Sequence, residues 1–82
     1  MSNTPGPLTL DQLRVGETAM IVQVLGYDAV AIRLMEMGLT DDEPIALIGK
    51  APLGDPLEYE IRGYHVSLRS TEARRVEIKR SI

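Results

Sequence analysis

The fold is decided by the stretch Lys50-Ala-Pro-Leu-Gly-Asp-Pro-Leu-Glu-Tyr-Glu-Ile-Arg-Gly-Tyr-His-Val-Ser-Leu-Arg69. From Leu57 to Ile61, apolar and charged residues alternate, which is the period of a strand with one buried face. Arg62-Gly63 then favours a tight turn, because glycine readily takes a positive φ, and the alternation resumes at Val66 and Leu68. These residues predict a β-hairpin. A hairpin alone is at best marginally stable, so the rest of the chain must cover its apolar face.

The hairpin is preceded by a loop between two prolines, Pro52 and Pro56. Proline fixes φ and donates no backbone hydrogen bond, so the loop is expected to be a stiff connector. Leu53 has no place in the alternation of the hairpin, which leaves two interpretations. The loop presents Leu53 to another protein, or Leu53 folds back as a lid on the barrel. The candidate partner-binding residues are therefore Pro52, Leu53, Gly54 and Asp55.

The N-terminal part of the chain predicts a short helix followed by a bulged strand. Thr9 and Gln12 have the spacing of a capping box, and Gly16 is expected to end the helix. We expect this helix to plug one end of a barrel. Residues 17–25 predict a strand, in which two competing alternations indicate a bulge near residues 22–23.

One amphipathic helix is predicted over residues 29–37. Asp28 is a favourable N-cap and Gly38 a favourable residue just after the C-terminus. Apolar side chains recur at i, i+4 and i+7, namely Val30, Leu34 and Met37. We interpret this stripe as a lid over the sheet.

The remaining elements complete a small barrel. Residues 45–48 predict a second strand, Ser70 is expected to cap a single helical turn through Arg74, and Val76 and Ile78 predict a closing strand. The chain is thus expected to be mainly β, with a short inserted helix and about five strands in a small SH3-like barrel. Closure of the sheet limits its exposed edges.

The composition sets the class of protein. The 82 residues are enough for one domain, expected at residues 8–82 after a disordered lead at residues 1–7. Phe, Trp and Cys are absent, so the core must be mainly aliphatic and no thiolate site exists. No apolar run approaches the ~18 residues of a membrane span, so we expect a cytoplasmic protein without direct membrane insertion.

Residues that could carry chemistry are sparse. His65 is the only histidine, and no partner spacing for a catalytic triad surrounds it. Glu58 or Glu60 could join His65 only in a weak metal site. The acidic run at residues 41–43 is expected to be a solvated turn, since it lacks the spaced ligands of a calcium loop. We predict no enzymatic activity, no cofactor and no specific metal site.

Several short motifs in register resemble the FeoA family of bacterial ferrous iron uptake. They include Met37-Gly38-Leu39, the loop motif Ala51-Pro-Leu-Gly-Asp-Pro56, and Glu72-Ala73. The resemblance runs from about Leu8 to Ile78. It departs at Asp42, where the family usually has glycine, although aspartate tolerates the left-handed conformation better than most residues.

The resemblance implies an accessory or regulatory protein that binds the membrane transporter FeoB through its cytoplasmic part. It also places the chain among proteins associated with transition metal ion binding, although the residues show no ligand cluster. Two alternatives remain. One is a regulatory domain similar to the C-terminal domain of DtxR-type iron-dependent repressors. The other is a nucleic-acid-binding barrel, which a net charge of −3 disfavours. The oligomeric state stays open.

The absence of a ligand cluster predicts the outcome of a metal titration. Ferrous iron titrated into the protein in a calorimeter should show no sub-micromolar binding, because a single imidazole and scattered carboxylates make a poor transition-metal site. Sub-micromolar binding that His65→Ala abolishes would contradict this prediction.

Overall fold

The computed structural model describes residues 8–80, so the predicted lead at residues 1–7 lies outside the described residues. The elements are η1 (Leu10–Gln12), β1 (Thr18–Val24), α1 (Ala29–Glu36), β2 (Pro44–Lys50), β3 (Leu57–Ile61), β4 (Tyr64–Leu68), α2 (Ser70–Ala73) and β5 (Val76–Arg80).

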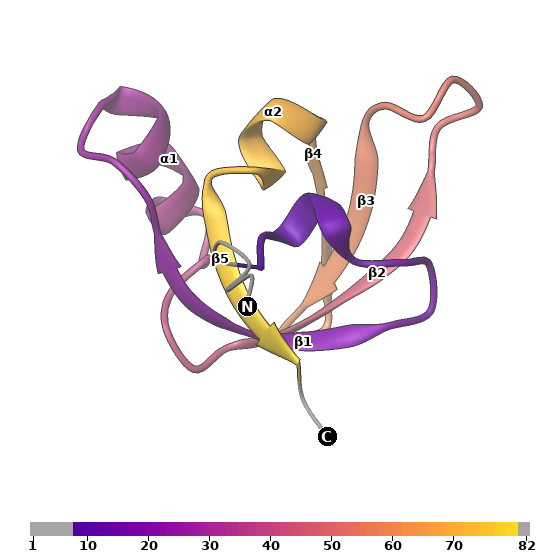
Figure 1. The fold of residues 1–82 in the computed structure, drawn as a ribbon, viewed down its shortest axis with the longest axis horizontal. Coiled ribbons are helices and arrows are strands. Elements are labelled where there is room, and N and C mark those ends of the chain that lie inside the picture. Colours follow the sequence, from indigo (N-terminus) through magenta and orange to yellow (C-terminus); the bar gives the residue numbers. More distant parts are fainter. Residues whose placement is uncertain (1–7, 81–82) are drawn as a thin grey trace, which may run out of the picture.

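The strands form one curled antiparallel sheet in the order β4-β3-β2-β1-β5. The helix α1 connects β1 to β2, and α2 connects the two edge strands, β4 and β5. Figure 1 shows α1, α2 and the β2–β3 loop at the same end of the barrel. The expected fold class, mainly β with five strands in a small SH3-like barrel, is confirmed.

The hairpin of β3 and β4 has the predicted turn. Ile61 pairs with Tyr64, and both turn residues have positive φ, 55° at Arg62 and 83° at Gly63. That combination matches the right-handed twist of the strands. Leu57, Tyr59 and Ile61 are all buried, so the predicted inward face of β3 is confirmed.

The long strands are bulged. The pairing of β1 with β5 shifts register between Ile21 and Gln23, which confirms the bulge predicted near residues 22–23. A second shift lies between Leu47 and Gly49 of β2, and the sequence did not indicate it. The strand β2 is also longer than the predicted residues 45–48, because its pairing with β3 continues as far as Lys50.

The core is aliphatic except for Tyr59. This side chain is fully buried, and its hydroxyl donates a hydrogen bond to the backbone oxygen of Leu10, 3.1 Å away. Burial raises the pKa of Tyr59, so the hydroxyl stays protonated and remains a donor. Leu10 and Leu13 are buried as the predicted plug.

The plug is shorter than predicted. The segment η1 is a three-residue 3₁₀ turn that ends at Gln12, because the backbone at Leu13 is already extended. Gly16 therefore does not end the helix. It has a φ of 92° and its N–H donates to the backbone oxygen of Leu47, which directs the chain into β1.

The helix α1 begins at Ala29 as predicted and ends at Glu36, one residue before the predicted end, with Met37 as its C-cap. The Asp28 carboxylate accepts a hydrogen bond from the Ala31 N–H at 3.1 Å, and Gly38 has a φ of 101°. Ala31 and Leu34 are the fully buried residues of the helix. Val30 and Met37 are partly buried and pack against the core beside Leu34, so the predicted apolar stripe faces the barrel.

Crowding at Gly38 predicts a large effect of a small substitution. A Cβ at this position would lie 2.5 Å from the Tyr64 hydroxyl oxygen. We expect Gly38→Ala to lower the free energy of unfolding by more than the about 1–2 kcal/mol that a left-handed conformation costs an L-residue. Urea unfolding measures this change.

Gly63→Ala is the matched control, because Gly63 also has a positive φ but nothing lies within 4 Å of a Cβ there. In a Tyr64→Phe background, which lacks the crowding hydroxyl, the excess loss at position 38 should disappear. Equal losses for the two alanine variants in the wild-type background would show that the contact with Tyr64 is not limiting.

Candidate partner-binding surface

Residues 51–56 connect β2 to β3 and project from the barrel (Figure 1). The loop is closed by its own backbone. The Gly54 N–H donates to the Ala51 oxygen at 2.7 Å, and the Ala51 N–H donates to the Pro56 oxygen at 3.0 Å. Gly54 has a φ of 90°, which favours glycine at the turn. Leu53 follows Pro52 at the tip and is 96% exposed.

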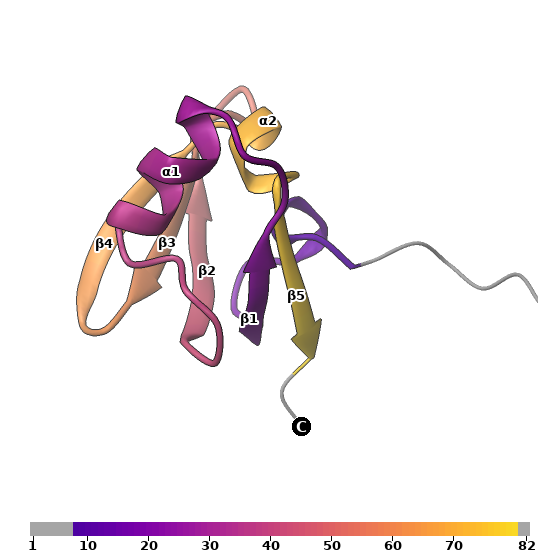
Figure 2. The same cartoon turned by 90° about the vertical axis from the view of Figure 1, so that its left-hand side faces the viewer.

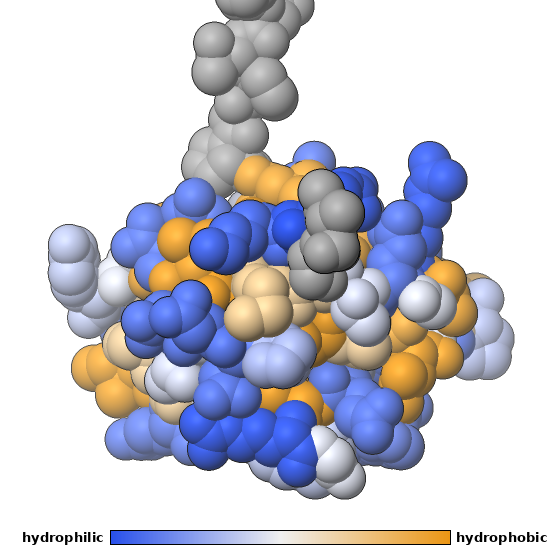
Figure 3. Space-filling view, turned by 90° about the horizontal axis from the view of Figure 1, so that it is seen from below, coloured by the Kyte–Doolittle hydropathy of each residue, from blue (hydrophilic) through white to orange (hydrophobic). Residues whose placement is uncertain are grey.

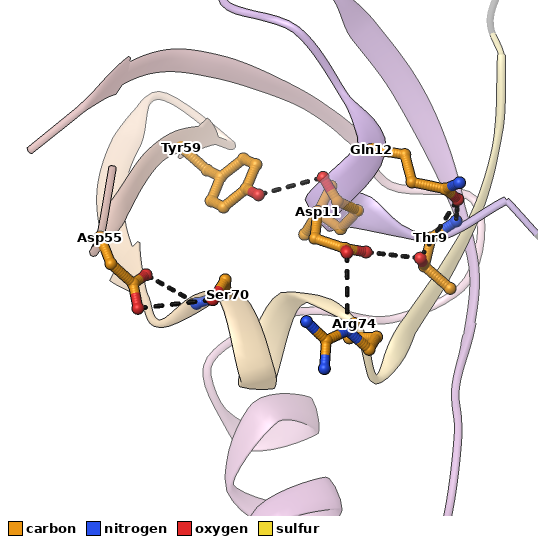
Figure 4. A network of polar contacts seen from close by, with 8 residues as sticks. Thr9, Asp11, Gln12, Asp55, Tyr59, Ser70 and Arg74 are labelled. Carbon is orange, nitrogen blue, oxygen red and sulfur yellow. Dashed lines mark hydrogen bonds and ion pairs between the residues drawn. The ribbon is translucent and has the colours of Figure 1, made fainter. Parts of the chain in front are cut away.

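Asp55 ties this loop to the start of α2 (Figure 4). Its carboxylate accepts hydrogen bonds from the Ser70 N–H at 2.8 Å and from the Ser70 hydroxyl at 3.4 Å. The prediction that Ser70 caps the helical turn was therefore wrong. Arg69 is the extended N-cap residue, and Ser70 already lies in the first turn, where Asp55 satisfies its N–H.

The structure gives different roles to the four candidate residues. All four are exposed, and the exposure of Leu53 excludes the interpretation that it folds back as a lid. Asp55 is bound to Ser70 of its own chain, so it positions the loop. Pro52 and Gly54 set its backbone. Binding of a partner by these residues stays a prediction.

Figure 4 also shows how the plug is fixed beside this loop. The Thr9 N–H donates to the Gln12 side-chain oxygen at 2.7 Å, as the capping box predicts. Asp11 approaches Arg74, just after α2, at 3.7 Å. The plug is thus linked to the same short helix as the loop.

The N-terminus of α1 is held by Arg75. The guanidinium lies 2.6 Å from the Asp28 carboxylate and also donates to the Leu25 backbone oxygen at 3.1 Å. The hydrogen bond from Arg75 holds the pKa of Asp28 below its usual value, and the same bond raises the pKa of Arg75. A Cβ at Gly26 would lie 2.3 Å from this guanidinium, so a side chain at position 26 would displace Arg75 from its present position.

Two further contacts hold α1 along its length. Arg33 forms an ion pair with Glu72 of α2, and the Tyr64 hydroxyl donates to the Met37 backbone oxygen at 2.7 Å. We call these two contacts and the Arg75–Asp28 pair the three tethers of α1. Their positions in the sequence did not indicate them, because each tether joins residues that are 27 or more positions apart.

His65 lies on the β3–β4 hairpin, where its Nδ1 atom is 3.3 Å from a Glu58 carboxylate oxygen. It also pairs with Glu60 in the strand register. Across residues 8–80, no group of three or more His, Cys, Asp or Glu side chains could hold a metal ion. The expected result of the iron titration stays a prediction.

The lower end of the barrel lies opposite α1, α2 and the β2–β3 loop (Figure 1). Seen from below, charged side chains are interspersed with small apolar areas (Figure 3). Asp42 takes the left-handed conformation with a φ of 64°, so the turn tolerates aspartate in place of glycine.

Among the described residues, no helix is long and apolar enough to span a membrane.

Comparison with known proteins identifies the family. Residues 8–80 match the model of the FeoA domain. The chain belongs to the FeoA family. It is also 38% identical over 72 residues to an Fe(2+) transport protein A/Fe(2+) transporter FeoB fusion protein of Porphyromonas gingivalis. That match covers 88% of this chain but only 8% of the fusion protein.

Solved FeoA structures have the same fold. The FeoA of Stenotrophomonas maltophilia complexed with zinc, described as a prokaryotic SH3 domain protein, is 32% identical with a TM-score of 0.79, covering 88% of this chain and 89% of that one. A FeoA-like protein of Clostridium acetobutylicum is 26% identical with a TM-score of 0.86, covering 96% and 92%. A manganese-dependent transcriptional repressor, 18% identical with a TM-score of 0.80, shares the fold over 44% of its chain.

The Asp28–Arg75 tether predicts a pH-dependent contribution to stability. Because the folded-state pKa of Asp28 is lowered, the contribution is present above its unfolded pKa of about 3.9 and is lost as the pH falls through the folded value. Asp28→Asn keeps a capping side chain but removes the charge. Its destabilisation, measured by urea unfolding, should therefore be larger at pH 7 than at pH 2.5.

An Arg75→Gln background is the control for this measurement. Without the guanidinium, the effect of Asp28→Asn should depend less on pH. An effect of Asp28→Asn that is the same at both pH values in the wild-type background would contradict a stabilising charge on Asp28.

Proposed function

We propose that this FeoA domain is a non-enzymatic accessory protein of bacterial ferrous iron uptake, which acts in the cytoplasm by binding the cytoplasmic part of a FeoB-type transporter. The relative of Porphyromonas gingivalis supports this partnership, because it joins an Fe(2+) transport protein A to an Fe(2+) transporter FeoB in one chain. A covalent link keeps the two fused proteins at a high effective concentration relative to each other, as would favour proteins that bind one another.

The exposure of Leu53 is the observation that carries the assignment of a contact surface. A leucine that is 96% exposed sits on a loop closed by backbone hydrogen bonds and tied to α2 through Asp55. A contact that is already ordered loses less conformational entropy on binding. The tip at residues 52–55 therefore suits an anchor in an apolar pocket of the partner.

The alternative functions have weaker support. A sequence pI near 5.0 and a net charge of −3 disfavour nucleic-acid binding, which requires a basic surface. The likeness to the transcriptional repressor is at 18% identity, which supports a common fold and no common function.

Leu53→Asp tests the proposed contact. We expect the variant to bind the purified cytoplasmic domain of the transporter at least tenfold more weakly, a loss of about 1.4 kcal/mol. Its free energy of unfolding should change by less than about 0.5 kcal/mol, as for other surface substitutions. Titration calorimetry and urea unfolding measure the two quantities.

Val15→Asp is the matched control, because Val15 is an exposed apolar residue (55%) in the turn before β1, outside the loop. It adds the same charge to the protein and should leave binding unchanged. Equal weakening by the two variants, or unchanged binding by Leu53→Asp, would reject the loop as the contact.

A further inference from the structure

A second surface lies between α1 and β1, away from the Leu53 loop. An open cleft of about 350 Å³ is walled by apolar side chains from β1, from α1 and from the segment that follows α1. These side chains are Val22, Val24, Met35 and Leu39. Figure 2 shows α1 and β1, the two elements that form its walls. In Figure 1 the helix lies on the opposite side of the molecule from the β2–β3 loop.

The helix α1 is apolar on its outer side as well as its inner side. Ile32 is 50% exposed and Met35 is 42% exposed, and Tyr27, just before the helix, is 99% exposed. The packing of Leu34, Val30 and Met37 against the core and the three tethers together fix this helix. Its outer surface is therefore ordered in the free protein, as a docking surface requires.

The charge around the cleft is acidic and unpaired. Asp41 lines the cleft and no basic residue does. Within residues 8–80, Glu36, Asp41 and Asp42 form no ion pair, whereas the neighbouring Asp28 and Glu43 each pair with an arginine. An apolar groove beside uncompensated carboxylates is complementary to a segment that has one apolar and one basic face.

We propose that this cleft binds a cationic amphipathic helix of a partner protein. An apolar side chain of that helix enters the cleft against Met35 and Val22, and its lysine or arginine residues face the carboxylates of Asp41, which lines the cleft, and of Asp42, which follows it in the sequence. An anionic lipid surface is disfavoured by the same carboxylates. The proposal is independent of the transporter partnership, because it uses neither the Leu53 loop nor the FeoB relative.

Two synthetic peptides test the chemistry of the site. One is an 18-residue amphipathic helix of leucine and lysine, and the other has glutamate at every lysine position. Titration of the full chain, followed by methyl and amide NMR shifts, should show that the lysine peptide perturbs Met35 and Val22 and leaves Leu53 unchanged. The glutamate peptide should bind at least tenfold more weakly. Raising the salt concentration from 50 to 300 mM should weaken the binding of the lysine peptide, because salt screens the attraction between charges.

Charge variants distinguish this site from general attraction to an acidic protein. Asp41→Lys should weaken binding of the lysine peptide about tenfold. Glu60→Lys changes the net charge equally on the exposed face of β3, away from the cleft, and should leave binding within about twofold. If Asp41→Lys fails to fold, the Asp41→Asn/Asp42→Asn variant replaces it, because asparagine tolerates the positive φ of position 42. Leu53→Asp should bind the peptide normally even if it no longer binds the transporter.

Three outcomes would overturn the proposal. One is equal binding of the two peptides, and another is equal effects of the Asp41 and Glu60 variants. The third is occupation of the cleft by a second copy of the chain, which sedimentation would reveal as concentration-dependent association that Met35→Glu abolishes.

Discussion

The positions of α1 and of the Leu53 loop both depend on polar contacts made by one short segment, residues 69–75. The backbone N–H of Ser70 binds Asp55 in the loop, the carboxylate of Glu72 binds Arg33 in the middle of α1, and Arg75 reaches the connection that precedes α1. The segment has only one helical turn of its own. It nevertheless contacts the elements at this end of the barrel, because it crosses between the two edge strands.

These contacts set geometry more than stability. They are largely exposed, and exposed ion pairs contribute about 0–1 kcal/mol each. Stability comes instead from the aliphatic side chains around Tyr59, whose hydroxyl is satisfied by the plug. A small chain with an apolar core and polar outer contacts can thus hold apolar side chains such as Leu53 and Met35 in water without collapse onto the barrel. Because the core supplies the stability and the polar contacts hold the loops in place, a domain of this size can keep apolar side chains exposed.

Features set by local chemistry were predictable from the sequence. The alternation in β3, the Asp28 cap, the glycine after α1 and the bulge of β1 all follow from residues a few positions apart, and each is present in the structure. The predictions that failed are the end of the first helix, which comes at Gln12 and not at Gly16, and the cap of α2. Ser70 does not cap α2, because Arg69 is the extended N-cap residue and Ser70 already lies in the first turn, where Asp55, 15 residues away, accepts a hydrogen bond from its N–H. The tethers could not be read from spacing, since only the closed barrel brings their partners together.

Proteins with this fold can differ in function, because the core and the exposed connections are set by different residues. A repressor with 18% identity retains the barrel, because many aliphatic sequences satisfy the inward alternation of five short strands. The Leu53 loop and the outer side of α1 lie instead in the connections between strands, where substitution leaves the core intact. Evidence about partners must therefore come from these connections. In this chain they present an apolar tip on one side and an acidic apolar cleft on the other, which are surfaces of different chemistry and are suited to different segments.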